Sequence, residues 1–396
     1  MKILKQLGFI PPYLWSTQFR LSHQLSYVQW SRKLEALKGN DEECSACIPQ
    51  GKFLLYSGQR PLLEPFVDHE DHTMADSLSS RAQMLTNAPI YEPQLQQIAW
   101  LSYPEVREVC LAIFVGNVLL HMTPSGQPIY AVQVGKLSKE DRTALKSLRP
   151  DAAIQDLRVA LFVVPRAQSE LLSRARSLLH FHEQNLYCGA CGTKTKCNAA
   201  GSYRYCETCK ASIYPSSKPV GIVLVTDERN SKALLVRQPR HPPGMFTCIA
   251  GFADIGETLE ACVKREVAEE AGLEVTAVRY LGCQHWPFPG SLMMGCIATA
   301  LTHEVSLDTS ELQDGRWWSR AEVEAAVTAS AANGSPWSLT ASAAGGSPWS
   351  LTSSAAGGSP WFSSEPKTAA LLLPPPMTIA HCLIRHWLET TSESSS

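Results

Sequence analysis

Three glutamates, Glu266, Glu269 and Glu270, lie at relative positions i, i+3 and i+4 in a segment that we expect to be helical. At this spacing their carboxylates converge on one side of a helix. Like charges so crowded repel one another unless a cation lies between them, and hard oxygen ligands select Mg²⁺ or Mn²⁺. Arg265 lies four residues before Glu269 and can hold its carboxylate in a charged pair. The alternative is an exposed, Glu-rich helix with solvated charges.

The residues around the glutamates predict how the chain holds them. We expect a strand that ends near Thr247–Ala250, a loop over Gly251–Gly256 and a helix that runs to about Ala271. Gly272 then suits the left-handed conformation that ends many helices. The apolar residues expected to pack this helix against its neighbours are Leu259, Val263 and Val267.

Four of the 13 cysteines form a second candidate metal site. Cys188-x2-Cys191 and Cys206-x2-Cys209 place two pairs of thiols in the short module Tyr187–Tyr214. Four thiolates close a tetrahedral Zn²⁺ site with no open position, which indicates a structural zinc in a zinc ribbon. The alternative is a former metal module whose thiols are now buried or free. Because the cysteine total is odd and spread over 396 residues, a secreted disulfide scaffold is disfavoured.

The glutamate segment fills every position of a known pattern. It reads Gly251-x5-Glu257-x7-Arg265-Glu266-Val267-x-Glu269-Glu270-x-Gly272-Leu273, which is the Nudix box GX5EX7REUXEEXGU. The chain therefore resembles the Nudix hydrolases, a family that cleaves nucleoside diphosphates linked to another moiety. The resemblance implies an α+β fold in which the Nudix domain is an α/β/α sandwich with a mixed sheet. It also implies that the catalytic residues are Arg265, Glu266, Glu269 and Glu270.

A second motif, Gln284-His-Trp-Pro-Phe-Pro-Gly-Ser291, begins about ten residues after the box. Trp286 and Phe288 offer flat faces on which bases can stack, and a proline-rich turn with core aromatics is the alternative. With the box and the cysteine module before it, the motif resembles the SQPWPFPxS signature of the NADH pyrophosphatase subfamily. It is more similar to the vertebrate mitochondrial members than to the bacterial ones. Cys283 and His285 replace the first Ser and the first Pro of that signature.

The subfamily resemblance assigns further residues. The carbonyl of Ala250 and the carboxylate of Glu311, which we expect on a strand, would join the three box glutamates as metal ligands. Leu373-Pro-Pro-Pro-x-Thr-Ile-Ala380 matches a C-terminal segment whose alanine lies at the substrate. The residues that the resemblance places at the substrate are Tyr214, Gln284, His285, Trp286, Pro287, Phe288, Pro289, Gly290, Ser291 and Ala380.

We expect the chain to divide into four parts. Residues 1–50 are a candidate transit segment, because the first forty residues carry six basic groups against one acid and have apolar residues at helical spacing. An ordinary surface helix or a frayed terminus is the alternative. Residues 51–180 should form an N-terminal α+β domain, followed by the zinc ribbon over 187–214 and the Nudix domain over 215–390.

Within the N-terminal domain, apolar and β-prone runs predict strands, and one leucine-rich run predicts a helix. The expected strands are Lys52–Tyr56, Glu108–Leu120 and Leu157–Val164, and the expected helix is Ala167–His180.

Residues 325–370 interrupt the Nudix domain. Ser-Pro-Trp recurs every twelve residues from Ser335, and Ala325–Ser364 holds no charged residue. We interpret this segment as a low-complexity insertion in a surface loop. The alternative is a linear motif that presents its tryptophans to a partner.

Charge and hydropathy limit the functions that the sequence allows. A formal net charge of -2 argues against a protein that coats nucleic acid. The longest nearly uncharged apolar stretch, Val109–Leu120, is too short for a membrane-spanning helix, which takes about 20 residues.

The resemblance implies hydrolysis of the pyrophosphate of NADH, and of NADPH or NAD⁺, to reduced nicotinamide mononucleotide and AMP. It implies Mg²⁺ or Mn²⁺ at the carboxylates, one structural Zn²⁺ and a homodimer. ADP-ribose or NAD-capped RNA as the substrate, and a catalytically weak dinucleotide-binding protein, are the alternatives. The N-terminal composition suggests a mitochondrial location, with the cytoplasm or the peroxisome as alternatives.

Overall fold

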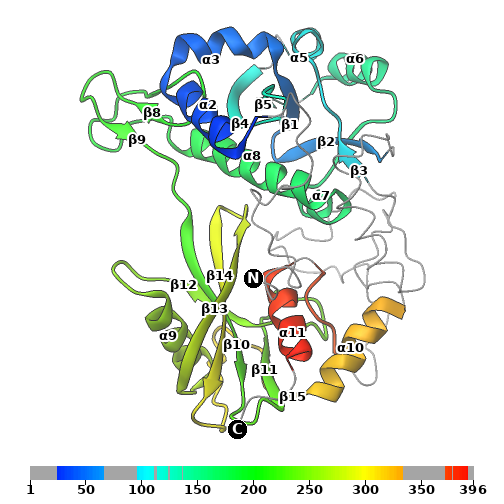
Figure 1. Cartoon of the computed structure of the whole chain (residues 1–396), viewed down its shortest axis with the longest axis vertical. Helices are drawn as coiled ribbons and strands as arrows, with labels where there is room; N and C mark the ends of the chain where they lie inside the picture. The colour runs from blue at the N-terminus through cyan, green and yellow to red at the C-terminus, as the bar shows by residue number, and fades with distance from the viewer. Residues whose placement is uncertain are drawn as a thin grey trace.

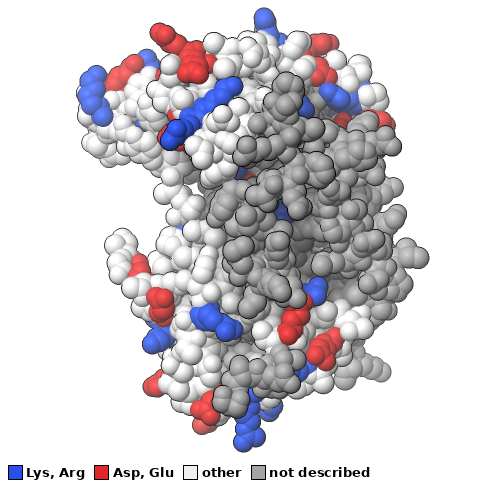
Figure 2. Space-filling view, in the orientation of Figure 1, with Lys and Arg blue, Asp and Glu red and all other residues white. Residues whose placement is uncertain are grey.

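The computed structural model describes residues 25–66, 96–110, 114–123, 125–135, 137–332, 371–376 and 378–390. In Figure 1 these residues form two lobes, each built on a β-sheet, with three short strands beside the upper lobe. Residues 1–24 and the Ser-Pro-Trp repeats lie outside the described residues. On the face drawn in Figure 2, Lys and Arg are interspersed with Asp and Glu over both lobes, in agreement with the balanced net charge.

The upper lobe is an α+β domain. Its sheet has the strand order β3-β2-β1-β5-β4, with β6 paired to β2, and β1 runs parallel to β5. Its strands are β1 (Lys52–Ser57), β2 (Arg60–Pro65), β3 (Gln96–Ile98), β4 (Phe114–Met122), β5 (Pro128–Val134) and β6 (Ala153–Ile154). Its helices are α2 (Tyr27–Gly39), α3 (Asp41–Cys47), η1 (Ile48–Gln50), α5 (Tyr103–Cys110), α6 (Lys139–Leu148), α7 (Leu157–Val163) and α8 (Arg166–Gln184).

The cysteine module is anchored on the upper lobe. The amide of Leu119 on β4 donates to the carbonyl of Ala200 at 2.8 Å, and the amide of Ala199 donates to Asp41 Oδ1 at 2.9 Å. Ala200 is fully buried in the core of that lobe. The strands of the module are β7 (Lys196–Cys197), β8 (Arg204–Tyr205) and β9 (Ser212–Ile213).

The lower lobe is a mixed sheet between two helical layers. Its strand order is β13-β14-β10-β11-β15, β12 pairs with β10, and β10 runs parallel to β14. Val263 and Val267 of α9 pack in one core, and Val323 of α10 packs with Ile384 of α11 in another. The α/β/α sandwich with a mixed sheet is therefore confirmed. Its strands are β10 (Lys218–Thr226), β11 (Lys232–Arg237), β12 (Ile249–Phe252), β13 (Val275–Trp286), β14 (Ser291–Ala300) and β15 (Asp314–Ser319), and its helices are α9 (Leu259–Ala271), α10 (Arg320–Ala332) and α11 (Ile379–Glu389).

One predicted strand is a helix. Residues 157–163 form α7, which begins where Asp156 Oδ1 accepts the amide of Arg158 at 2.9 Å. A short apolar run fits a buried helix as well as a buried strand, so the pattern alone could not distinguish them. The prediction for Glu108–Leu120 is wrong at its start, because α5 continues to Cys110, whereas the helix predicted over Ala167–His180 is confirmed within α8.

The upper lobe begins before the predicted boundary at residue 50. Leu34 and Leu37 on α2 and Cys44 on α3 are buried in the same core as Phe53 of β1. A transit segment is removed after import and cannot supply core residues. Helices α2 and α3, within the predicted segment 1–50, therefore belong to the upper lobe, and the transit segment stays a prediction for the residues before them.

The predicted insertion 325–370 also begins too early. Helix α10 continues to Ala332, and its Ala326 is buried in the lower core. The chain is fixed again at Leu372, whose amide donates to the carbonyl of Gly244 at 2.8 Å and whose carbonyl accepts the amide of Phe246 at 2.9 Å. Within the ranges that the structure describes, no helix has the length and apolar character needed to span a membrane.

Replacing Leu37 by Ala is expected to destabilise the protein by about 2–5 kcal/mol, because this fully buried side chain would leave a cavity. Val28→Ala on the same helix is the matched control. Val28 is 53% exposed, so its truncation should change the free energy of unfolding by less than about 0.5 kcal/mol. Urea unfolding measures both variants, and equal stabilities would contradict the place of α2 in the core.

Candidate functional site

The box glutamates lie on α9 beside the strand β12. Glu266 and Glu270 are buried, whereas Glu269 is exposed. Gly251 on β12 lies so close to Glu266 that a Cβ at this glycine would be 1.8 Å from Glu266 Cδ. Any other residue would displace the carboxylate, which is the physical reason for the first glycine of the box. The helix ends at Gly272 with a φ of 66°, the left-handed stop that the sequence predicts.

Arg265 ties the loop, the strand and the helix together. Its guanidinium donates two hydrogen bonds of 2.9 Å to Glu257 and one of 2.9 Å to each of Glu266 and Glu269. It also donates to the carbonyl of Phe252 at 2.8 Å. The bonds from Arg265, with one from a backbone amide, lower the pKa of Glu257 to about 2, so this carboxylate stays ionised at neutral pH.

Burial and repulsion from neighbouring carboxylates raise the pKa values of the two inner glutamates, Glu266 and Glu270. Burial, followed by repulsion from Glu266 and Glu311, raises the pKa of Glu270 to about 7. Burial is also the main cause that raises the pKa of Glu266. Among the described residues, Glu270 Oε2 is a buried oxygen with no hydrogen-bond partner. Such an oxygen is costly unless a proton or a cation reaches it, and an all-oxygen donor set fits Mg²⁺ or Mn²⁺.

The two other predicted ligands lie next to this cluster. Glu311 is in an exposed turn before β15 rather than on a strand, and its charge raises the pKa values of both inner glutamates. Ala250 precedes Gly251 on β12 and pairs with Ile222 of β10. Because Arg265 already holds two of the carboxylates, a divalent ion would have to share them with the guanidinium.

The four predicted zinc cysteines come together. Cys188 Sγ lies 3.5 Å from Cys209 Sγ, and Cys191 Sγ lies 3.4 Å from Cys206 Sγ. All four sulfurs lie within 4.8 Å of one another, and over the described ranges this is the one such group of candidate metal ligands. Zn–S bonds of about 2.3 Å in a tetrahedron place the sulfurs about 3.8 Å apart, so the group fits Zn²⁺ closely.

The second motif forms the tip of the β13–β14 hairpin rather than a separate loop. Gln284, His285 and Trp286 end β13, and Ser291 begins β14 opposite Trp286. The turn between them comprises Pro287, Phe288, Pro289 and Gly290, and Gly290 has a φ of 136°, which favours glycine. His285 Nε2 lies 2.7 Å from Ser177 Oγ on α8, so the hairpin tip contacts the upper lobe.

Phe288 reaches further into the upper lobe. Its ring is partly buried against the core that contains Leu157, and the guanidinium carbon of Arg158 lies 4.6 Å from the ring centroid. The ring of Trp286 meets Phe288 edge-on at 5.5 Å. Phe288 therefore joins the two lobes in this structure, and its stacking on a base stays a prediction.

Gln284 and Ala380 meet although the Ser-Pro-Trp repeats separate them in sequence. Gln284 Oε1 accepts the amide of Ile379 at 2.8 Å and so fixes the start of α11. Ala380 follows Ile379 and is buried in the lower core. Tyr214 differs from these, because it is 65% exposed beside the ribbon, with its ring 5.4 Å from that of Tyr203.

The structure adds three residues that the sequence analysis missed. Arg158 and Ser177 contact the hairpin tip, and the charge of Arg240 lowers the pKa of Glu270 against the effect of burial. No local pattern marks them, because their partners are distant along the chain; Ser177 and His285 are 108 residues apart.

Known proteins match both lobes. A NUDIX domain model matches residues 216–338, and a model of an NADH pyrophosphatase-like rudimentary NUDIX domain matches residues 50–180. The human mitochondrial NAD(P)H pyrophosphatase NUDT13 is 31% identical over 373 residues, which cover 93% of this chain and 93% of that protein. The chain belongs to the Nudix hydrolases.

Further relatives of this Nudix hydrolase include a second NAD(P)H pyrophosphatase and a protein named for a different activity. The mouse mitochondrial NAD(P)H pyrophosphatase NUDT13 is 33% identical over 379 residues, again 93% of each chain. The human NAD-capped RNA hydrolase NUDT12 is 36% identical over 237 residues, which are 58% of this chain and 44% of that protein. A solved NUDIX hydrolase from Nitrosomonas europaea aligns with a TM-score of 0.30 at 24% identity, over 34% of this chain and 77% of its own.

Glu270→Gln should stabilise the metal-free protein at high pH. With its pKa raised to about 7, Glu270 contributes stability fully below its usual pKa of 4.5 and loses that contribution as the pH rises through about 7. The variant cannot ionise, so at pH 8 it should exceed the wild type by at most about 3 kcal/mol, with little difference near pH 4.5. Chemical unfolding in EDTA measures this, with Glu260→Gln on the exposed side of α9 as the control. A difference independent of pH would contradict the raised pKa.

Cys206→Ser should remove zinc from the purified protein and lower its melting temperature, because three thiolates leave the tetrahedral site incomplete. Cys197→Ser is the matched control, since Cys197 is an exposed cysteine of the same module outside the four-sulfur group. Elemental analysis and thermal unfolding measure both variants. Equal zinc content in the two would refute the assignment.

Proposed function

We propose that this Nudix hydrolase cleaves the pyrophosphate bond of NADH, with NADPH and NAD⁺ as related substrates, to give reduced nicotinamide mononucleotide and AMP. The observation that carries the proposal is the pair of buried carboxylates, Glu266 and Glu270, on the helix of a complete Nudix box, with Glu266 packed against Gly251. Two relatives that align over 93% of the chain are named NAD(P)H pyrophosphatases, which supports the choice of substrate.

The metal ligands would be Glu266, Glu269 and Glu270, with Glu311 and the carbonyl of Ala250. Bound Mg²⁺ or Mn²⁺ would offset the phosphate charge and lower the pKa of a water molecule. The protein's own part is to keep this negative cluster in place. Arg265 does so by holding three carboxylates and the end of β12 in one arrangement.

Hydrolysis requires a base for the proton of the attacking water. As water adds to one phosphorus, the bond from that phosphorus to the bridging oxygen breaks, and the base takes one water proton. Glu269 suits this role best, because its side chain is 59% exposed while that of Glu266 is 12% exposed. Arg265 restrains the Glu269 carboxylate at 2.9 Å and leaves the carboxylate open to solvent.

NAD-capped RNA is the second candidate substrate. The human NUDT12 relative is named an NAD-capped RNA hydrolase, and the tyrosines beside the ribbon offer aromatic rings to bases. The same bond is broken in both substrates, so the carboxylate chemistry is unchanged. ADP-ribose as the substrate and dinucleotide binding without turnover are the remaining alternatives. Product analysis with NADH, NAD-capped RNA and ADP-ribose, together with a binding measurement on NADH, separates them.

The proposed cellular location rests on the names of relatives. The NUDT13 relatives are named mitochondrial, and we propose the same location for this protein. A homodimer stays a prediction, which sedimentation of the purified protein would test.

Glu270→Gln should lower the kcat for NADH by at least about 100-fold and leave the fold intact, because it removes a metal-binding charge but keeps the shape of the side chain. Glu260→Gln, on the exposed side of the same helix, should keep kcat within about twofold. Chromatographic detection of reduced nicotinamide mononucleotide and AMP measures turnover. Normal turnover by Glu270→Gln would refute the proposed function.

A further inference from the structure

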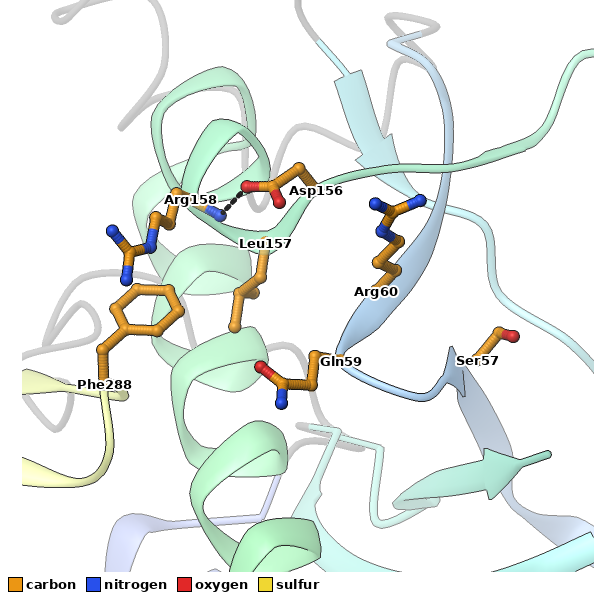
Figure 3. Close-up of a pocket in the computed structure, with 7 residues that line it drawn as sticks. All are labelled: Ser57, Gln59, Arg60, Asp156, Leu157, Arg158 and Phe288. Carbon is orange, nitrogen blue, oxygen red and sulfur yellow. Dashed lines mark hydrogen bonds between the residues drawn. The ribbon is translucent and has the colours of Figure 1, made fainter. Parts of the chain in front are cut away.

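A cavity of about 380 Å³ lies where the upper lobe meets the hairpin tip of the Nudix domain. Figure 3 shows its lining: Ser57, Gln59 and Arg60 from the β1–β2 turn, Asp156, Leu157 and Arg158 from the start of α7, and Phe288 from the Nudix domain. Its volume is in the range of small-molecule sites, about 300–1,000 Å³. Phe288 is the one lining residue among the predicted substrate contacts, and the other six have no role in the chemistry proposed above.

The charges of the lining favour an anion. The lining contains two guanidiniums, those of Arg60 and Arg158, and one carboxylate, that of Asp156. The Asp156 carboxylate is partly engaged, because its Oδ1 accepts the amide of Arg158 at 2.9 Å. A metal cation would meet two positive groups here, whereas a phosphate would meet two donors of the kind that bind it.

The rest of the lining fits a planar, hydrogen-bonding group. The Arg158 guanidinium lies over the Phe288 ring, 4.6 Å from its centroid, and a base can stack on the outer face of this guanidinium. Gln59 extends its amide toward the cavity in Figure 3, and Ser57 adds a hydroxyl group. These groups can bind base or ribose edges, which a simple inorganic anion lacks.

We propose that this cavity between the lobes is a second binding site, which takes a phosphate-bearing ribonucleotide. The nucleotide has two sources with the same chemistry: a free nucleoside monophosphate, or a nucleotide of the RNA that follows an NAD cap. The ligand would contact both lobes, because Phe288 comes from the Nudix domain and the other lining residues from the upper lobe. If the ligand is a free nucleotide, the proposal is independent of the proposed function. If the ligand is a nucleotide of NAD-capped RNA, the proposal rests on that function.

Arg60→Gln tests the site, with Arg142→Gln as the matched control. Both arginines are exposed on the upper lobe, and Arg142 on α6 lies outside the cavity lining. In the first arm, AMP is added to the protein in EDTA and the melting temperature is measured. A free-nucleotide site predicts an AMP-dependent rise in the wild type and in Arg142→Gln that falls by at least about half in Arg60→Gln.

In the second arm, kcat/KM is measured with Mg²⁺ for NADH and for an NAD-capped trinucleotide. A site for capped RNA predicts that Arg60→Gln lowers kcat/KM for the capped trinucleotide about fivefold and leaves that for NADH within about twofold. Gln59→Glu adds a negative charge to the exposed turn and should repel the phosphate. It should therefore reduce the AMP-dependent rise in melting temperature if the site takes a free nucleotide, or kcat/KM for the capped trinucleotide if the site takes capped RNA.

A specific effect in either arm supports the site and identifies the source of the nucleotide. Responses of Arg60→Gln and Gln59→Glu that equal those of Arg142→Gln in both arms would overturn the proposal. An AMP effect that is the same in all variants means binding elsewhere and counts against it. If the wild type cleaves neither NADH nor the capped trinucleotide, the proposed function fails, and the AMP arm alone decides on the site.

Discussion

The Arg265 guanidinium is the contact on which the arrangement of the Nudix box depends. It reaches the loop at Glu257, the end of β12 at the Phe252 carbonyl, and two glutamates of its own helix. Lysine could not replace it, because an ammonium group has three donors on one atom and cannot span these acceptors. The glycine at 251 completes the constraint, since it lets the strand approach the Glu266 carboxylate.

This arrangement keeps the inner glutamates under electrostatic strain. Arg265 offsets the charges on the outer side of the cluster, but Glu270 Oε2 receives no hydrogen bond from the described residues. The raised pKa of Glu270 shows that the fold favours its neutral form in the absence of a cation. Burying these charges without a cation is unfavourable, and the two apolar cores of the lobe must offset that cost.

Features that depend on residues close together in the sequence could be predicted from it. The helix of the box, its stop at Gly272 and the convergence of the four ribbon cysteines each follow from residues close together in the chain. The helix α7 could not be predicted, because six of its seven residues are apolar and they lack a distinguishing period.

The direction of Phe288 could not be predicted either. The motif itself indicates a rigid aromatic turn, and only the fold places Arg158 of the other lobe over the ring. Glu311 was expected on a strand and lies in a turn, since β15 begins three residues later, at Asp314. Contacts between segments more than a hundred residues apart decide the position of the hairpin tip that carries Phe288, and local spacing in the sequence cannot predict such contacts.

Contacts with the Nudix domain fix the chain on both sides of residues 333–370. Before that segment, α10 packs its Ala326 into the lower core, and after it the backbone of Leu372 is bonded to Gly244 and Phe246. The bonds of Leu372, with the bond from the Ile379 amide to Gln284, set the position of α11 by contacts with the Nudix domain rather than by the length of chain that precedes it. A change in the number of twelve-residue units would leave each of these contacts in place.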